Sequence, residues 1–368
     1  MRVAHVITGL RTGGAEIQLQ LLLRHTTTDP MVVALSNADE VADAIRTDGI
    51  PVVNLEMRSN RDLKTIGALT TLLQRHRPDV VHLHLYRATV YGRVAARLAG
   101  VPVVVTTEHS LLDGQIEGRP VTRAVRGLYL ATEPLNSATV AVSDEVARRL
   151  VDWGVPAPKV HTIPNGIELA RFTCRDAAQR AKDRARMRAA LAIPDHAQVV
   201  GGIGRLYPSK RWDLLLRALA CDLGEHRRLL LVGAGEEEAQ LRRLAASLSI
   251  TEWVHMPGAT PEMAPMLAAM DVVASPAPQE TFGMAGVEAA AAGLPVVYVH
   301  SPALEVLGSV PGLTRASGAE QPLRDAILTA LSSRDRPPEA ALARYDIRIN
   351  AQAVDSLYGH YRHRKHRP

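Results

Sequence analysis

The sequence contains little cysteine and few aromatic residues. Cys174 and Cys221 are its only cysteines, so no disulfide framework is expected, and a cytoplasmic location is the natural expectation. Aromatic residues make up 4% of the 368 residues, which leaves no platform of rings on which the bases of a nucleic acid stack. We therefore expect no nucleic-acid partner, although the net charge is +5.

Long apolar runs are also missing. None approaches the roughly 18–20 residues that a membrane-spanning helix needs. The apolar stretch at residues 3–8 is too short for a signal peptide and predicts a first strand. The tail, residues 361–368, is strongly basic. Such a charge favours a surface that faces phosphate-bearing substrates or an anionic membrane, so peripheral membrane contact stays open.

The length predicts two domains, at roughly 100–200 residues each. In the first half, short apolar runs alternate with helical patterns, which is typical of a parallel, doubly wound α/β sheet. The expected strands are 3–8, 31–35, 52–55, 80–83, 103–106, 139–142 and 159–163, and the expected helices are 15–25, 38–48, 62–76, 89–99 and 144–153. The segment 111–134 is predicted to be irregular at first and then helical. Pro164-Asn165-Gly166-Ile167 breaks the alternation.

The second half resumes the same alternation after a charged helix expected at 174–191. Its expected strands are 199–203, 229–232, 253–256, 270–275 and 295–299, with helices beginning near residues 211, 236 and 284. The strands are nearly all apolar, as expected for a sheet that is covered on both faces. A last helix, 346–361, has no strand after it. We therefore predict domains at 1–165 and 166–345, followed by a C-terminal helix and basic tail at 346–368.

The stretch from Glu280 to Glu288 is the main candidate site. It follows an apolar strand and begins an Ala-rich helix near Met284. The backbone N–H groups of Phe282, Gly283 and Met284 at the helix start can hold an anion or hydroxyls. Glu280 can accept hydrogen bonds from a sugar, and Glu288 can reach another part of the ligand, such as a ribose. This favours a nucleotide sugar, while an ordinary crossover with two solvated acids stays open.

Two further strand–helix turns suit phosphate. Arg205 sits at the carboxyl end of its strand and Lys210 is expected to begin the next helix, so two cations lie beside a helix N-terminus. Two solvent-exposed cations are the alternative interpretation. Gly13 and Gly14 form a phosphate-compatible turn in the first half, or merely a tight one, because G-x-G-x-x-G is absent. Gly258 follows another strand of the second half.

Histidines gather at the ends of two strands of the first half. His82, His84, Tyr86 and Arg87 lie at or just beyond one strand end, and His109 follows another. Both groups should lie on the ligand-binding edge of the sheet. His82 and His84 share a face, but without Cys or Asp partners nearby we expect no metal site. His109 can equally be a structural loop histidine.

These motifs together resemble family 4 of the retaining glycosyltransferases, which have the GT-B fold. The resemblance spans nearly the whole chain. It rests on Glu280 to Glu288, on Gly204-Arg205-Leu206 with Lys210, on Gly13-Gly14-Ala15-Glu16 and on Pro164-Asn165-Gly166-Ile167. It implies two Rossmann-like domains that face each other across a cleft, the first for the acceptor and the second for the nucleotide-sugar donor. It also implies a last helix that crosses back to the first domain.

The resemblance also implies roles for individual residues. Arg205 and Lys210 would hold the diphosphate, Glu288 the ribose, and Glu280 the sugar hydroxyls. The implied donor-binding residues are Gly13, Gly14, Arg205, Lys210, Gly258, Glu280, Thr281, Phe282, Gly283, Met284 and Glu288; the acceptor-binding residues are Tyr86, Arg87 and His109; and the catalytic residues are His109, Glu280, Arg205 and Lys210. Neither a metal nor a cofactor is implied, because the cations stabilise the leaving diphosphate.

The expected reaction is transfer of a sugar, with retention, from a nucleotide sugar to an acceptor hydroxyl. UDP is the expected nucleotide and GDP the alternative. The acceptor is expected to be a secondary metabolite; a lipid-linked cell-envelope intermediate stays open, as do another GT-B enzyme, such as a sugar-nucleotide epimerase, and a non-catalytic binding module. One motif departs from the family pattern: His300-Ser301 stands where many relatives have Gly-Gly before the acid Glu305, which bears on the donor sugar or its orientation.

Overall fold

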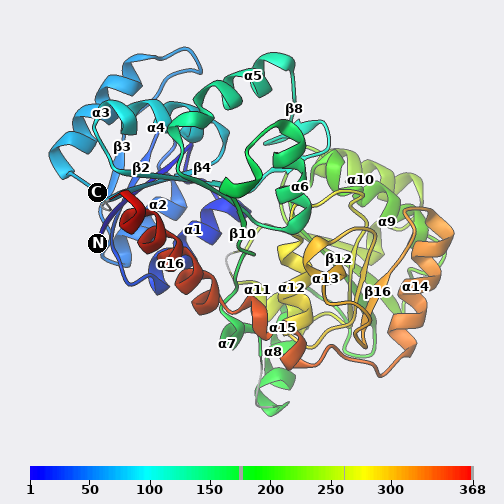
Figure 1. Ribbon diagram of the computed structural model, residues 1–368. Coiled ribbons are helices and arrows are strands. Elements are labelled where there is room, and N and C mark those ends of the chain that lie inside the picture. The colour runs from blue at the N-terminus through cyan, green and yellow to red at the C-terminus, as the bar shows by residue number, and fades with distance from the viewer. Residues whose placement is uncertain (174–176, 261, 366–368) are drawn as a thin grey trace. The chain divides into compact units, whose positions relative to one another are not determined.

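The computed structural model describes residues 1–173, 177–260 and 262–365. Cys174 and the two residues after it lie outside the described residues, as do the last three residues, so the predictions for the start of the charged helix and the end of the basic tail fall there. Internal contacts divide the chain into two compact units, Met1–Ile167 with Tyr345–Pro368, and Glu168–Arg344. Each unit contains one parallel sheet (Figure 1).

The first unit is built on a parallel sheet with the strand order β10-β9-β5-β4-β1-β2-β3. Its strands are β1 (Arg2–Ile7), β2 (Asp29–Ala34), β3 (Val52–Asn54), β4 (Val80–His84), β5 (Val103–Glu108), β9 (Ala138–Ala141) and β10 (Val160–Thr162). Its helices are α1 (Gly14–His25), α2 (Glu40–Thr47), α3 (Lys64–His76), α4 (Tyr86–Leu98), α5 (Arg123–Thr132), α6 (Asp144–Trp153) and α16 (Ile347–Lys365).

Alternation along β1 shows why helices cover both faces of this sheet. Ala4 and Val6 point to the face where α3 and α4 supply Leu69 and Tyr91. Ile7 points to the other face and packs in a cluster formed with α1 and α2. Successive side chains of a strand alternate between faces, so a strand that is apolar throughout buries both.

The second unit has the strand order β13-β12-β11-β14-β15-β16, again all parallel. Its strands are β11 (Gln198–Ile203), β12 (Arg227–Val232), β13 (Val254–Gly258), β14 (Val272–Ser275), β15 (Val296–Tyr298) and β16 (Leu313–Arg315). Its helices are α7 (Leu169–Phe172), α8 (Ala177–Ala190), α9 (Trp212–Leu219), α10 (Glu238–Ser247), α11 (Met263–Ala268), α12 (Met284–Ala291), α13 (Pro302–Glu305), α14 (Glu320–Ser332) and α15 (Glu339–Leu342). The strands expected from the sequence are present in both units; β16 was not expected.

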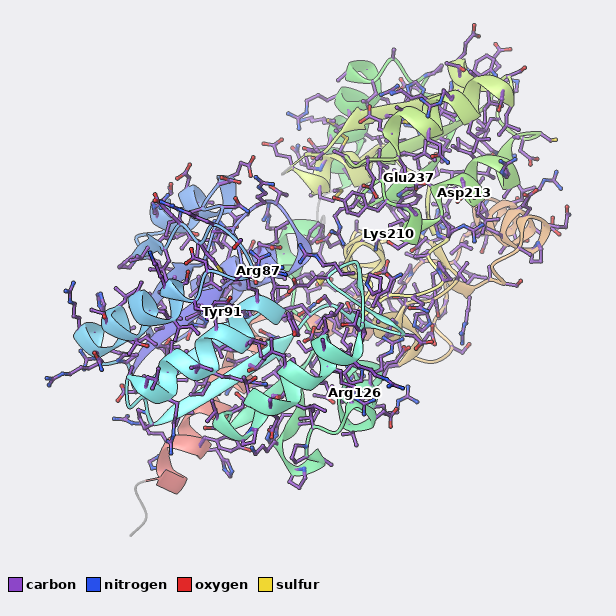
Figure 2. The ribbon with its side chains drawn as sticks, turned by 90° about the horizontal axis from the view of Figure 1, so that it is seen from above. Arg87, Tyr91, Arg126, Lys210, Asp213 and Glu237 are labelled. Atoms are coloured by element: carbon purple, nitrogen blue, oxygen red, sulfur yellow. The ribbon has the colours of Figure 1, made fainter. Side chains whose placement is uncertain are left out.

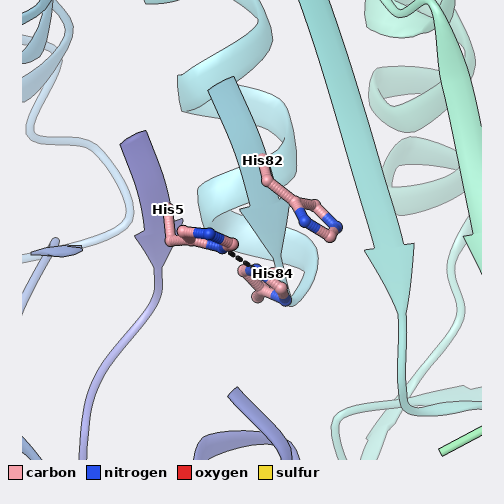
Figure 3. A group of neighbouring side chains, drawn as sticks. All are labelled: His5, His82 and His84. Atoms are coloured by element: carbon pink, nitrogen blue, oxygen red, sulfur yellow. Dashed lines mark hydrogen bonds between the residues drawn. The ribbon is translucent and has the colours of Figure 1, made fainter. Parts of the chain in front are cut away.

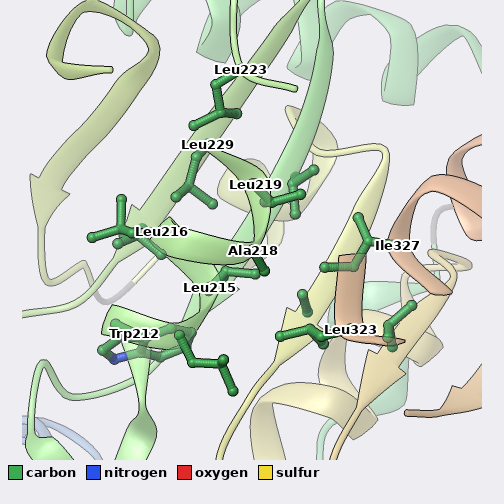
Figure 4. Close-up of a cluster of buried hydrophobic side chains, with 14 of the residues drawn as sticks. Trp212, Leu215, Leu216, Ala218, Leu219, Leu223, Leu229, Leu323 and Ile327 are labelled. Atoms are coloured by element: carbon green, nitrogen blue, oxygen red, sulfur yellow. The ribbon is translucent and has the colours of Figure 1, made fainter. Parts of the chain in front are cut away.

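The core of the second unit forms where α9 packs against the sheet and α14. Trp212 is 1% exposed, and Leu215 and Leu219 are fully buried beside it. Leu323 and Ile327 of α14 close the same cluster (Figure 4). Burying side chains of this size stabilises a fold by about 1.5–3 kcal/mol each, so this cluster fixes α9 and with it the turn that precedes the helix.

Residues 111–134 end in a helix, α5, as predicted, but their first part is not irregular. Three two-residue strands, β6 (Leu111–Leu112), β7 (Gln115–Ile116) and β8 (Arg119–Pro120), form an antiparallel sheet before α5. Gly114 and Gly118 make its turns with φ of +67° and +73°. Strands of two residues are too short to produce a periodic apolar pattern, so the sequence did not predict this sheet.

Two helix starts also differ from the prediction. The helix expected at 89–99 begins at Tyr86, and Figure 2 places Arg87 and Tyr91 along it. It is preceded by Leu85 at φ +72°, and leucine carries no sequence signal for a helix start. Lys210 does not begin a helix: it ends a short 3₁₀ turn, and α9 starts at Trp212.

The last helix, α16, belongs to the first unit. Thr26 donates a hydrogen bond from its hydroxyl to Asp355 (2.7 Å), and the Thr27 N–H donates to the same carboxylate (2.8 Å). Val354 and Tyr358 pack in one buried cluster with strands β1, β4, β5 and β9. Within the described part of the chain, no helix is both long and apolar enough to cross a membrane.

Glycines let the loops after three neighbouring strands touch at their backbones. Gly204 after β11, Gly233 after β12 and Gly258 at the end of β13 have φ of +148°, +152° and +91°. The Gly233 N–H donates to the Gly258 carbonyl (2.9 Å). A Cβ at Gly233 would lie 1.9 Å from the Gly204 carbonyl oxygen, so no other residue fits there.

We expect the Gly233→Ala protein to be destabilised by about 2–4 kcal/mol, because the added methyl meets backbone that does not give way and the positive φ strains it. Gly224→Ala is the matched control, since a Cβ there has no atom within 4 Å. Urea unfolding followed by tryptophan fluorescence reports both midpoints. Equal midpoints would contradict the close approach of the two loops.

Candidate functional site

The loops after β11 and β14 bring Lys210 and Glu280 together. The two strands are neighbours in the parallel sheet, so their loops leave the same edge. The Lys210 ammonium forms an ion pair with the Glu280 carboxylate, and the side chains are 22% and 15% exposed. The resemblance assigned them to different parts of a ligand; in the structure they contact each other.

Arg205 lies on the loop after β11, as Lys210 does. Its backbone is fixed, because the Trp212 indole N–H donates to the Arg205 carbonyl (3.0 Å). Its side chain is exposed and stacks over the Tyr207 ring at 4.8 Å. Among the described residues this guanidinium has no carboxylate partner. Arg205 therefore offers a positive charge that no carboxylate neutralises, on a backbone that a hydrogen bond holds in place.

The start of α12 is fixed by the loop that follows β15. Gly283, with φ +96°, precedes the helix, and a Cβ on it would lie 2.3 Å from the Ser301 hydroxyl oxygen. Ser301 donates from that hydroxyl to the Phe282 carbonyl (3.3 Å), which also accepts from the Ala303 N–H (3.0 Å). The first N–H groups of α12, such as that of Met284, have no acceptor within the helix. The sequence revealed the unusual Ser301 but not that it holds this turn.

Glu305, next along the same loop, is held by its neighbours. The His300 ring Nδ1 lies 3.0 Å from one carboxylate oxygen, and the Ser301 N–H donates to that oxygen (3.1 Å). Arg315 approaches the other oxygen at 3.3 Å. The Glu305 carboxylate therefore has three partners, and two of them come from His300 and Ser301, the residues that depart from the family pattern.

Glu288 lies on α12 and is partly buried. Burial raises the pKa of its carboxyl to about 7, and Arg171 opposes the shift. A carboxyl that is half protonated near neutral pH both donates to and accepts from a hydroxyl. Thr281 and Phe282 lie on the loop between Glu280 and this helix, with the Phe282 ring buried.

In the first unit, histidines from neighbouring strands form a connected group. His5 Nδ1 lies 3.2 Å from His84 Nε2 (Figure 3), and His84 Nδ1 lies 3.2 Å from His109 Nε2. Burial lowers the pKa of His5 and of His109 to about 4. His82 and His84 also have pKa values well below the ordinary range, again because they are buried. All four rings are therefore neutral at pH 7.

The sequence missed His5 as a member of this group. Its signal was present, because β1 pairs with β4 and His5 stands opposite His82 in the register. Only the strand order makes this visible, since β1 and β4 are separated along the chain by two other strands. His5 is a single histidine within an apolar strand and looks unremarkable by itself.

The remaining predicted residues lie at the edges of their own sheets. Tyr86 donates from its hydroxyl to the Val125 carbonyl (2.9 Å), so its hydroxyl ties α4 to α5. Arg87 follows it in the first turn of α4. Gly13 precedes α1 in an extended conformation, and a Cβ on Gly14 would meet no atom within 4 Å. Gly258 is similarly open. Gly14 and Gly258 therefore leave open space beside the backbone, whereas a Cβ on Gly13 would lie 2.3 Å from a Glu16 carboxylate oxygen.

Comparison with known proteins identifies the family. Residues 12–171 match the family model described as Glycosyltransferase Family 4, and residues 197–333 match the model for Glycosyl transferases group 1. Over 277 residues the chain is 31% identical to the GDP-mannose-dependent alpha-(1-6)-phosphatidylinositol dimannoside mannosyltransferase of Mycobacterium tuberculosis, covering 73% of this chain and 70% of that protein. The chain belongs to glycosyltransferase family 4.

Two further likenesses fit this family 4 chain. It is 31% identical over 304 residues to a D-inositol 3-phosphate glycosyltransferase of Nocardia farcinica, covering 77% of the chain but 64%, less than two thirds, of that relative. The crystal structure of Anabaena Alr3699/HepE in complex with UDP and glucose superposes with a TM-score of 0.77 at 22% identity, covering 99% and 98% of the two chains. The predicted family and GT-B fold class are thus confirmed.

The raised pKa of Glu288 predicts a pH-dependent effect on stability. Between pH 4.5 and 7 the folded protein holds a proton there that the unfolded chain releases, so this carboxyl makes the fold less stable as pH rises through that window. Glu288→Gln removes the effect. We expect the variant to gain stability relative to the unsubstituted protein as pH rises: the difference between their free energies of unfolding, variant minus unsubstituted, should be about 2 kcal/mol larger at pH 8 than at pH 5.

Chemical denaturation of both proteins at the two pH values measures this double difference. Other titrating groups, such as the buried Glu108, cancel because they are common to both proteins. A difference that is the same at pH 5 and pH 8 would contradict the raised pKa of Glu288.

Proposed function

We propose that this chain transfers a sugar, with retention of configuration, from a nucleoside-diphosphate sugar to a hydroxyl of an acceptor. The observation that carries the proposal is the Lys210–Glu280 ion pair, together with the exposed Arg205 on the same loop as Lys210 and the start of α12, which no side chain caps and which follows Glu280 closely in the chain. A diphosphate is bound by cationic side chains and N–H groups, and the hydroxyls of a hexose are bound by a carboxylate. Groups of all three kinds lie on the loops that leave this edge of the sheet.

In this proposal Glu280 neutralises Lys210 until the diphosphate of the donor binds. A buried or half-buried ammonium is costly without a counter-charge, and Glu280 supplies one when no diphosphate is bound. A bound diphosphate takes over Lys210, together with Arg205, and leaves the Glu280 carboxylate to accept hydrogen bonds from the sugar hydroxyls. Glu288 then binds the ribose, and the backbone from Thr281 to Met284 lies against the sugar and phosphate.

The chemistry proposed for this site is a substitution at the anomeric carbon. The bond from that carbon to the diphosphate oxygen breaks, a bond to the acceptor oxygen forms on the same face, and the acceptor proton passes to the departing phosphate. Arg205, Lys210 and the α12 N–H groups stabilise the charge that develops on the diphosphate, which is the task that a metal performs elsewhere. In this proposal the reaction therefore requires no metal.

The other predicted residues keep their proposed roles. Gly13, Gly14 and Gly258 are proposed to admit the donor close to the backbone. Tyr86, Arg87 and His109 are proposed for the acceptor side and the sugar, with Tyr86 acting through its ring, since its hydroxyl is already bonded. We propose a cytoplasmic location, where nucleotide sugars are available.

UDP is our proposed nucleotide and GDP the alternative, since one relative is named for GDP-mannose and one structural neighbour is described with UDP. The relatives' names make inositol phosphate and a phosphatidylinositol-type lipid the first acceptors to test beside secondary metabolites. Product analysis without acceptor distinguishes transfer from epimerisation of the nucleotide sugar.

Substitutions at the ion pair should move UDP affinity in opposite directions. Lys210→Ala should weaken UDP binding about tenfold or more, because a charge-assisted contact to phosphate is lost. Glu280→Gln should leave UDP binding equal or tighter, because it removes the competing carboxylate, yet lower the transfer rate about 100-fold. Arg243→Ala, which removes an exposed cation of α10, should change neither.

Isothermal titration with UDP and with GDP, followed by a transfer assay on the same preparations, provides both readouts. Loss of UDP affinity in Glu280→Gln as large as in Lys210→Ala would mean that the carboxylate does not compete with the phosphates. No binding of either nucleotide by the unsubstituted protein would remove the proposal altogether.

A further inference from the structure

Three histidine rings of the first unit form a hydrogen-bonded series that ends at His109. His5 lies on β1, His84 on β4 and His109 just after β5, and these strands are neighbours in the sheet. The two contacts, His5 Nδ1 to His84 Nε2 and His84 Nδ1 to His109 Nε2, are both 3.2 Å. The atoms at the two ends, His5 Nε2 and His109 Nδ1, are buried and have no partner among the described residues.

Neutral rings allow this series only two arrangements of protons. A neutral imidazole has one N–H donor and one bare nitrogen that accepts, and each contact needs one of each. Once one contact is oriented, the middle ring forces the other to point the same way. In the first arrangement protons point from His109 towards His5; in the second they point from His5 towards His109. The rings are neutral because burial disfavours the charged form.

The two ends of the series are not equivalent, and this selects between the arrangements. His5 is 1% exposed, so the first arrangement leaves a buried N–H without an acceptor, which is rare and costs about 1–3 kcal/mol. The second leaves only a bare nitrogen at His5. It places the N–H on His109 Nδ1, which is also buried, but His109 is partly exposed and lines a cavity of about 20 Å³ with Gln18 and Asn165, so that a water or a substrate oxygen can reach this end of the series more easily than the other.

A shared metal ion is the competing explanation for this cluster. Ring nitrogens of His5, His82 and His84 lie within 4.8 Å of one another, close enough for one ion. However, His82 Nδ1 lies 2.5 Å from the Tyr358 hydroxyl and His82 Nε2 lies 2.6 Å from the Thr107 hydroxyl. His82 therefore has both nitrogens engaged, and hydrogen bonding accounts for the group.

We propose that His5 and His84 are positioning residues that hold His109 as the neutral tautomer protonated at Nδ1, so that His109 donates a hydrogen bond to a substrate oxygen and does not act as a base. Its Nε2 accepts from His84 and its Nδ1 carries the proton, so neither nitrogen is available to take one. The part of this inference that concerns substrate rests on the proposed function; the part that concerns the tautomer does not.

The tautomer is read directly by nitrogen-15 NMR of the full chain labelled in histidine. Two-bond nitrogen–proton correlations distinguish an Nδ1–H ring from an Nε2–H ring and from imidazolium, and the signals missing from the His109→Gln protein assign His109. We expect a neutral Nδ1–H ring at pH 7. An Nε2–H or doubly protonated His109 overturns the proposal, as does stoichiometric binding of added Zn²⁺ that shifts the signals of His5, His82 and His84 together.

Two substitutions of His84 separate positioning from packing. His84→Asn keeps an N–H near the place of Nδ1, so His109 should stay protonated at Nδ1; His84→Leu removes the donor, so the Nε2–H form should appear. In the transfer assay we expect kcat to fall about tenfold in His84→Leu, with KM for the nucleotide sugar within about twofold, and to recover in His84→Asn. Unchanged kcat and tautomer in His84→Leu would refute the role.

The test needs a control variant and a second readout in case a variant does not fold. His161→Gln removes another ring that contacts α16, through the Tyr361 hydroxyl at 3.0 Å, but lies outside the series and should not change kcat. If His84→Leu does not fold, the His84→Asn spectrum decides, since loss of the Nδ1–H signal there contradicts the proposal. If no nucleotide sugar is turned over, the proposed function fails while the spectra still test the tautomer.

Discussion

The hydrogen bonding of β11 to β14 is the constraint on which the candidate donor site depends. These strands are far apart in the sequence but adjacent and parallel in the sheet, so their carboxyl ends deliver two loops to one place. Lys210 from one loop and Glu280 from the other then form an ion pair. Charges this poorly exposed need a partner, and in the proposed function a diphosphate would replace Glu280 as the partner of the lysine.

Further contacts fix the loops and turns of the second unit. Trp212, the buried first residue of α9, donates to the Arg205 carbonyl, and Ser301 donates to the Phe282 carbonyl at the turn before α12. Gly233 and Gly204 let the adjacent loops touch. Donor groups that are fixed before the ligand arrives need no reorganisation when charge develops on it, which is the condition for effective electrostatic stabilisation.

Much of the fold follows from the sequence because both units alternate apolar strands with amphipathic helices. The residues of the candidate site are also visible, since Arg205, Lys210 and Glu280 stand at strand–helix turns and Glu288 lies in the helix that follows one of them. Their pairing is not, because it depends on strand order, and the sequence does not state that the strand ending at Ile203 lies beside the one ending at Ser275. His5 escaped notice for the same reason.

Other features were invisible for local reasons. The strands β6 to β8 have two residues each and carry no periodicity, and Leu85 adopts a positive φ that leucine rarely takes. The sequence shows that His300-Ser301 differs from the family pattern. It does not show that Ser301 holds the turn before α12, because Gly283 lies close to Ser301 only in the folded chain. The types of the candidate residues could thus be predicted from the sequence, but the contacts between them depend on the order of the strands in the sheet.

Hydrogen–deuterium exchange with and without saturating UDP tests most directly whether the edge of the second sheet binds the diphosphate. The account predicts slower exchange of the amides at the start of α12, from Gly283 to Ala285, and in the loop from Gly204 to Lys210, because phosphate oxygens would accept hydrogen bonds there. Protection confined to other segments, with these two unchanged under saturation, would contradict it.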